Sequence, residues 1–135
     1  MVAKIFWLLV AAVAVVVLVP PVRERVWPRL QPAFNPVYQW NARTRVNEIR
    51  DLVKRADATG RPIPTTADEF AQFVDREDMQ HDASLDPWGT PYYILMDRAT
   101  FQVGSAGKDL QPGTEDDILS QPEPLSRQAD RRRRF

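Results

Sequence analysis

The apolar positions follow three different patterns along the chain. Residues 5–19 are apolar without interruption, residues 37–59 carry apolar side chains at helical spacing, and residues 92–103 hold two short apolar runs separated by residues 97–99. These patterns predict an apolar helix, an amphipathic helix and a β-hairpin. We therefore expect an α+β fold with a small antiparallel hairpin.

A further short helix is predicted to begin after Thr66. Thr66 and Glu69 have the spacing of a capping box, in which each side chain satisfies a free backbone donor of the first turn. The buried side of this helix is expected to hold Phe70, Phe73 and Val74. Gly60 ends the preceding helix, and residues 37–120 together are expected to form one small domain.

The apolar run at the start of the chain predicts a transmembrane helix. Lys4 is the only charged residue before position 20, and Pro20 and Pro21 end the run. Fifteen residues in a helix span roughly 23 Å, whereas a hydrocarbon core is ~30 Å thick. The helix can be extended over residues 1–3 if Lys4 snorkels toward the headgroups. Residues 1–21 are therefore expected to form a single-pass anchor in a bacterial inner membrane.

A cleaved signal peptide is the alternative interpretation of the same run. It is disfavoured because no small-x-small cleavage site follows Val19. In a retained anchor, Phe6 and Trp7 are expected to contact lipid. The positive-inside rule weakly favours a cytoplasmic body, because more arginines follow the run than precede it.

Five prolines between residues 20 and 36 predict an extended arm over residues 22–36 rather than a continuous helix. Aromatic residues in and just after the arm are interleaved with three arginines: the aromatics are Trp27, Phe34, Tyr38 and Trp40, and the arginines are Arg23, Arg25 and Arg29. Aromatic and cationic side chains together are typical of a membrane interface. The same arm could equally lie against the transmembrane helices of neighbouring subunits.

The charges balance to zero over the whole chain but are strongly segregated. Nine basic and four acidic residues lie in 22–61, three basic and thirteen acidic residues in 62–126, and five basic residues and one acidic residue in 127–135. The net charges of these segments are therefore +5, −10 and +4. Complementary surfaces of this kind favour oriented docking, whereas the large acidic segment disfavours nucleic-acid binding.

The composition gives little support to catalysis. The chain has no cysteine, so thiol chemistry and cysteine-ligated metals are excluded. His81 is the only histidine and has no second imidazole to share a metal, which makes it an ordinary loop residue. Ser105 lies near two glycines without a recognisable base. We therefore expect neither an enzyme nor a small-molecule substrate.

Two strings of residues resemble the major pseudopilin of type II secretion systems. The first is Asp86-Pro-Trp-Gly-x-Pro-Tyr92, and the second, after the hairpin, is Ser105-Ala-Gly-Lys-Asp109. Together with the stretch from Ile49 to Thr65, the resemblance covers roughly residues 46–119. It implies a long N-terminal helix and a head of one short helix and a β-hairpin, located in the periplasm.

The resemblance also implies a calcium site, because the family binds this ion in the loop after the hairpin. The matching carboxylates are Asp109, Asp116 and Asp117, and main-chain carbonyls near Val103 and Ser105 could complete the shell. Calcium takes about 6–8 oxygen ligands from flexible loops. A solvated acidic turn is the alternative, since this loop is shorter and less glycine-rich than the family's.

The N-terminus departs from the family pattern. Pseudopilins carry glycine–phenylalanine at the peptidase site and a glutamate early in the mature helix, whereas this chain has no such glycine and no acid before Glu24. We therefore expect a non-catalytic accessory subunit of a large membrane complex, for example a photosynthetic reaction-centre–antenna or respiratory assembly, that docks through a pseudopilin-like head. The alternative is a type II secretion pseudopilin that packs into a pseudopilus.

The last segment, residues 121–135, reads as a polar tail. It ends in four consecutive arginines, Arg131, Arg132, Arg133 and Arg134, followed by Phe135. These arginines are expected either to contact acidic partner surfaces or anionic lipid, or to be solvated. The partners expected overall are membrane lipid and other membrane-protein subunits.

Overall fold

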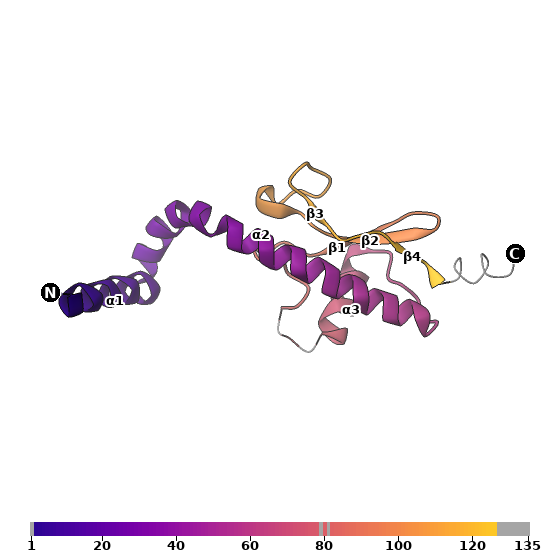
Figure 1. Cartoon of the computed structure of the whole chain (residues 1–135), viewed down its shortest axis with the longest axis horizontal. Helices are drawn as coiled ribbons and strands as arrows, with labels where there is room; N and C mark the ends of the chain where they lie inside the picture. Colours follow the sequence, from indigo (N-terminus) through magenta and orange to yellow (C-terminus); the bar gives the residue numbers. More distant parts are fainter. Residues whose placement is uncertain (1, 79, 81, 127–135) are drawn as a thin grey trace, which may run out of the picture. The chain divides into compact units, whose positions relative to one another are not determined.

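The computed structural model describes residues 2–78, 80 and 82–126. In chain order its elements are α1 Val2–Leu18, α2 Pro20–Ala58, α3 Ala67–Glu77, β1 Tyr93–Met96, β2 Thr100–Ser105, the 3₁₀ helix η1 Gly107–Asp109, β3 Ile118–Leu119 and β4 Glu123–Pro124 (Figure 1). The chain forms two compact units, Met1–Pro36 and Val37–Phe135. The α+β class and the small antiparallel sheet predicted from the sequence are confirmed.

The apolar helix α1 is shorter than the sequence suggested. It has 17 residues, or about 26 Å at ~1.5 Å per residue, and it ends because Val19 precedes Pro20 and is biased away from helical backbone. No helix in the described part of the chain combines the length and the apolar character that a membrane crossing requires. The predicted transmembrane helix of residues 1–21 is therefore wrong, and the predicted single-pass location in the inner membrane loses its basis.

The predicted extended arm is also wrong, because α2 is helical from Pro20 onward and contains Pro28, Pro32 and Pro36. Pro20 and Pro21 occupy the first turn, where a backbone N–H has no helical partner in any case. The three later prolines are spaced by four residues, so the hydrogen bonds that they remove all lie along one side of the helix, where a bend can relieve the ring contacts.

In the second unit, local signals fix the helix ends as predicted. Gly60, with φ of 74°, follows the end of α2, and only glycine adopts this backbone conformation without a steric penalty. The Thr66 side chain accepts a hydrogen bond from the Glu69 amide, which caps α3. The predicted buried side of α3 is confirmed, since Phe70, Phe73 and Val74 are all buried.

The sheet is built around β2. The predicted hairpin is present, with β1 antiparallel to β2 in a register that places Tyr93 opposite Gly104 and Met96 opposite Phe101. On its other edge β2 pairs with β3 near Ser105 and with β4 near Thr100. The two-residue strands β3 and β4 were not predicted, because so short a strand has no periodicity of its own.

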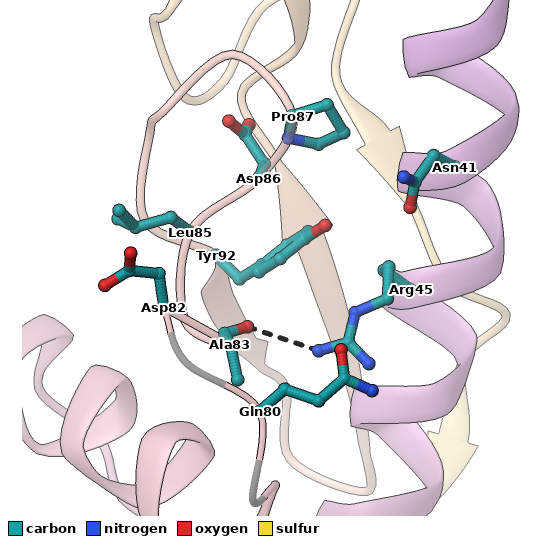
Figure 2. Close-up of a pocket in the computed structure, with 9 residues that line it drawn as sticks. All are labelled: Asn41, Arg45, Gln80, Asp82, Ala83, Leu85, Asp86, Pro87 and Tyr92. Atoms are coloured by element: carbon teal, nitrogen blue, oxygen red, sulfur yellow. Dashed lines mark hydrogen bonds between the residues drawn. The ribbon is translucent and has the colours of Figure 1, made fainter.

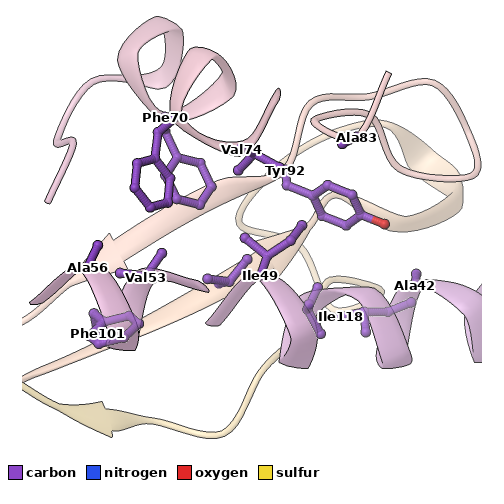
Figure 3. Close-up of a cluster of buried hydrophobic side chains, with 13 residues drawn as sticks. Ala42, Ile49, Val53, Ala56, Phe70, Val74, Ala83, Tyr92, Phe101 and Ile118 are labelled. Atoms are coloured by element: carbon purple, nitrogen blue, oxygen red, sulfur yellow. The ribbon is translucent and has the colours of Figure 1, made fainter. Parts of the chain in front are cut away.

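The core of this unit lies between α2, α3 and the sheet (Figure 3). Ile49 and Val53 from α2 meet Phe70 from α3 and Phe101 from β2, and all four are fully buried. Burying one large apolar side chain contributes about 1.5–3 kcal/mol. The buried cluster begins at Ala42, so the second unit has a core of its own that contains none of the described side chains of α1.

Candidate functional site

From Ile5 onward, the described surface of α1 is apolar on every side. Ile5, Phe6, Trp7, Leu8 and Leu9 are each between 58% and 70% exposed. Successive residues of an α-helix lie about 100° apart, so this run covers the whole circumference. Phe6 and Trp7 contact each other edge to face, with ring centroids 6.1 Å apart. A helix that is apolar all round is normally buried in its working environment.

The predicted interfacial residues lie on α2. Arg25 and Arg29 are exposed there. Arg23 and Trp27 belong to the helical backbone, but their side chains lie outside what the structure describes. The four arginines of the tail, Arg131, Arg132, Arg133 and Arg134, and the loop residue His81 also lie outside the described residues.

The acidic loop after η1 is closed by its own hydrogen bonds. Asp116 accepts bonds from the Asp109 amide at 3.1 Å and from the Thr114 hydroxyl at 2.7 Å, and the Thr114 bond is the main cause that lowers the pKa of Asp116 below its ordinary value. Asp117 accepts bonds from the Tyr93 hydroxyl and from the Gly113 amide. These carboxylates therefore stabilise the loop and tie it to β1.

The structure does not arrange these carboxylates as a metal-binding group. Within the described residues, no set of three or more acidic or imidazole side chains is placed to hold a metal ion. The carbonyl of Val103 accepts the Ser120 amide at 2.8 Å, and Ser105 is fully buried in its pairing with β3. In the described structure the Val103 carbonyl and the carboxylates of Asp116 and Asp117 accept hydrogen bonds from the protein itself, and the calcium site that the resemblance implied stays a prediction.

A buried pair that the sequence did not reveal joins the two motif strings. The Ser105 hydroxyl donates to Asp86 at 2.6 Å, and both residues are buried. Asp86 also accepts the backbone amides of Trp88 at 3.1 Å and Thr90 at 2.8 Å. Ser105 was predicted to have no base partner. Asp86 supplies a carboxylate, but a fully buried hydroxyl cannot reach a substrate, so this pair is structural.

A polar cavity of about 190 Å³ lies between α2 and the loop before β1 (Figure 2). Figure 2 shows Arg45 of α2 on one side, with its guanidinium bonded to the Ala83 carbonyl, and the ring of Tyr92 facing it. Arg45 also forms ion pairs of 2.8 Å with Glu48 and Asp78. The Arg45 guanidinium is therefore already paired within the chain. Among the residues that line the cavity, no nucleophilic side chain has a base beside it.

Burial raises the pKa of the Tyr92 hydroxyl well above its ordinary value of 10.0. The unfolded chain therefore releases this proton first as the pH rises, and the native state binds more protons than the unfolded state above about pH 10. The free energy of unfolding is expected to fall there by about 1.4 kcal/mol per pH unit for this one group. Denaturant titrations above and below this pH, compared with those of the Tyr92→Phe variant, measure the effect. If the free energy of unfolding of Tyr92→Phe falls with pH as steeply as that of the wild type, groups other than Tyr92 cause the loss of stability at alkaline pH.

No protein-family model, no curated protein and no solved structure matches this chain.

Proposed function

We propose that this protein is a non-catalytic structural subunit of a larger protein complex. In this proposal α1 packs among helices of other subunits, and the unit Val37–Phe135 provides a docking surface. The observation that carries the proposal is the apolar circumference of α1, whose side chains are exposed in the isolated chain. Such a helix gains roughly 25 cal/mol for each Å² of apolar surface that a partner covers.

The second unit supports a docking role rather than a catalytic one. Its core is complete, and no buried side-chain nitrogen or oxygen in the described residues lacks a hydrogen-bond partner. Its exposed charges are segregated, with Arg43 and Arg55 on α2 and a net charge of −10 over residues 62–126. Segregated charge orients an encounter and speeds it more than it adds affinity.

A type II secretion pseudopilin is the second candidate function. The observation in its favour is that the two strings that resemble this family, Asp86–Tyr92 and Ser105–Asp109, are joined by the buried Asp86–Ser105 hydrogen bond. The apolar run of residues 5–19 lacks the glutamate that the family carries early in its mature helix, which speaks against this function. A pseudopilin would assemble mainly with copies of itself, whereas an accessory subunit would be recovered with different subunits.

Two lysines in α1 should abolish the assembly. In the tagged full-length chain, Leu9→Lys with Val13→Lys places two charges one turn apart on α1. Burying an unpaired charge costs several kcal/mol, so we expect recovery of protein partners, quantified by cross-linking in the source cells and mass spectrometry, to fall at least about tenfold. The thermal unfolding of the second unit should not change, because neither Leu9 nor Val13 belongs to its core.

The matched control carries Asp68→Lys with Gln72→Lys, which places two lysines at the same spacing on the exposed side of α3. It should retain the partners. A wild-type chain recovered without any stoichiometric protein partner would overturn the proposal, and a complex made only of this chain would favour the pseudopilin alternative.

A further inference from the structure

The outer edge of β3 carries unpaired main-chain groups. In the part of the chain that the structure describes, β3 pairs with β2 alone, in a register that places Leu119 opposite Gly104. The following amide, that of Ser120, donates to the Val103 carbonyl at 2.8 Å. Leu119 is therefore in a non-hydrogen-bonded position of the antiparallel pair, with its N–H and C=O directed away from β2. No described residue bonds to either group, so both are available to a further strand.

A groove lies along this edge, between β3 and α2. It has a volume of about 380 Å³ and is lined by Arg43, Asn47, Asp117, Ile118, Leu119 and Gln121. The Leu119 side chain is 44% exposed there, and the exposed Gln121 side-chain amide has no partner among the described residues. An extended segment that pairs with the Leu119 main chain would therefore contact an apolar side chain and an amide as well.

Arg43 gives this groove an unpaired positive charge. Its guanidinium is exposed and forms no ion pair or hydrogen bond with any residue that the structure describes. Other cations on the same side of α2 are paired. Arg50 contacts Asp51 at 2.8 Å, and Lys54 contacts Glu123 at 2.6 Å. Arg43 is thus the cation on this side of α2 that remains for a ligand.

The acid in the lining, Asp117, is already engaged. Its carboxylate accepts hydrogen bonds from the Tyr93 hydroxyl, the Gly113 amide and the Thr114 hydroxyl. These donors stabilise the Asp117 charge, whereas nothing in the described structure does the same for Arg43. A guanidinium binds a carboxylate through two parallel hydrogen bonds. The groove therefore favours a segment that brings an acidic side chain to Arg43.

We propose that the groove binds an extended segment of another subunit, which adds a strand to β3 through the Leu119 main chain and pairs an acidic side chain with Arg43. This inference rests on the proposed function and specifies the chemistry of the segment that docks. Main-chain bonds supply affinity in strand addition, and side-chain contacts supply specificity. Residues 127–135 of the same chain are a poor occupant, because their net charge of +4 would face Arg43.

Peptide selection tests the charge preference. Random heptapeptides displayed on phage are panned on the immobilised full-length chain in mild detergent. The wild type should enrich peptides with an acidic residue at one fixed position. Arg43→Glu should enrich a basic residue at that position instead, since the groove charge is reversed. The matched control is Arg55→Glu, which reverses an exposed charge about 120° further round α2 and should enrich the wild-type consensus.

A synthetic peptide with the selected consensus tests strand addition. Its dissociation constant is measured by fluorescence anisotropy, and we expect it to rise at least about tenfold in Arg43→Glu and less than about twofold in Arg55→Glu. Leu119→Pro removes the outward N–H and should raise it about fivefold over Leu119→Val, which keeps the amide. Because this N–H takes no part in the pairing with β2, proline is tolerated at the edge, and thermal unfolding will check that the variant is folded.

Three results would contradict the inference: no consensus on the wild type, a consensus without an acidic position, or equal binding by Arg43→Glu and Arg55→Glu. A consensus that matches a segment of this chain would also overturn it, because the occupant would then be a second copy. The two proposals fail separately. If no peptide is selected while lysines in α1 still abolish the recovery of partners, the groove is wrong and the structural role stands.

Discussion

Asp86→Ala is expected to lower the free energy of unfolding of the second unit by about 3 kcal/mol. The Asp86 carboxylate accepts three hydrogen bonds, from Ser105, Trp88 and Thr90, and hydrogen bonds to a charged acceptor contribute about 1.5–3 kcal/mol each without being additive. Alanine would leave the buried Ser105 hydroxyl without this acceptor. Because small domains are stable by only about 5–15 kcal/mol, the loss is a large part of the total, and urea denaturation followed by tryptophan fluorescence will measure it.

Asp97→Ala is the matched control for this change. Asp97 also begins a turn and accepts a nearby amide, that of Arg98 at 2.7 Å, but it is exposed to solvent, so water can replace the lost acceptor. We expect a loss below about 1 kcal/mol. Similar losses for Asp86→Ala and Asp97→Ala would show that burial of the Asp86 pair does not matter.

Gly107→Ala is expected to destabilise the second unit by about 3 kcal/mol as well. Gly107 has φ of 69°, and a Cβ atom at this position would overlap the main-chain carbonyl of Asp116. The left-handed backbone costs about 1–2 kcal/mol for alanine, and forcing apart well-packed groups adds about 1–3 kcal/mol. The displaced Asp116 would also lose its bonds to the Asp109 amide and the Thr114 hydroxyl, and the loss of the first can be followed by the chemical shift of the Asp109 amide.

Gly113→Ala separates the two causes. Gly113 has φ of 88°, but no atom lies within 4 Å of the Cβ that alanine would add. This variant therefore carries the backbone strain without the overlap, and about 1 kcal/mol is expected. A Gly107→Ala variant as stable as Gly113→Ala would mean that the loop relieves the overlap with Asp116 without a measurable cost.

These predictions bear on the function because the Asp86 turn, the acidic loop and the hairpin form one connected body. Asp86 holds Ser105 at the end of β2, Tyr93 of β1 holds Asp117, and Asp116 holds the backbone of Asp109 beside Leu110. A rigid loop loses less conformational entropy when a partner binds. These hydrogen bonds thus hold the acidic loop in one conformation, which favours the docking role proposed for this unit.

The sequence alone determined those features that depend on neighbouring residues. Thr66 and Glu69 predicted the start of α3, Gly60 predicted the end of α2, and the runs on either side of residues 97–99 predicted the hairpin. Capping, left-handed turns and alternation are set by residues within a few positions of one another, so their signals are complete in a short stretch of sequence.

The tertiary structure decided what depends on partners far apart in the chain. Three contacts join residues separated by many positions in the sequence. They are the Asp86–Ser105 hydrogen bond, the pairing of β3 and β4 with β2, and the hydrogen bond from the Tyr93 hydroxyl to Asp117. Even the helical path through Pro28, Pro32 and Pro36 contradicts the local preference of proline. Such outcomes depend on which acceptor or apolar surface the folded chain brings close, and a single sequence does not specify these distances.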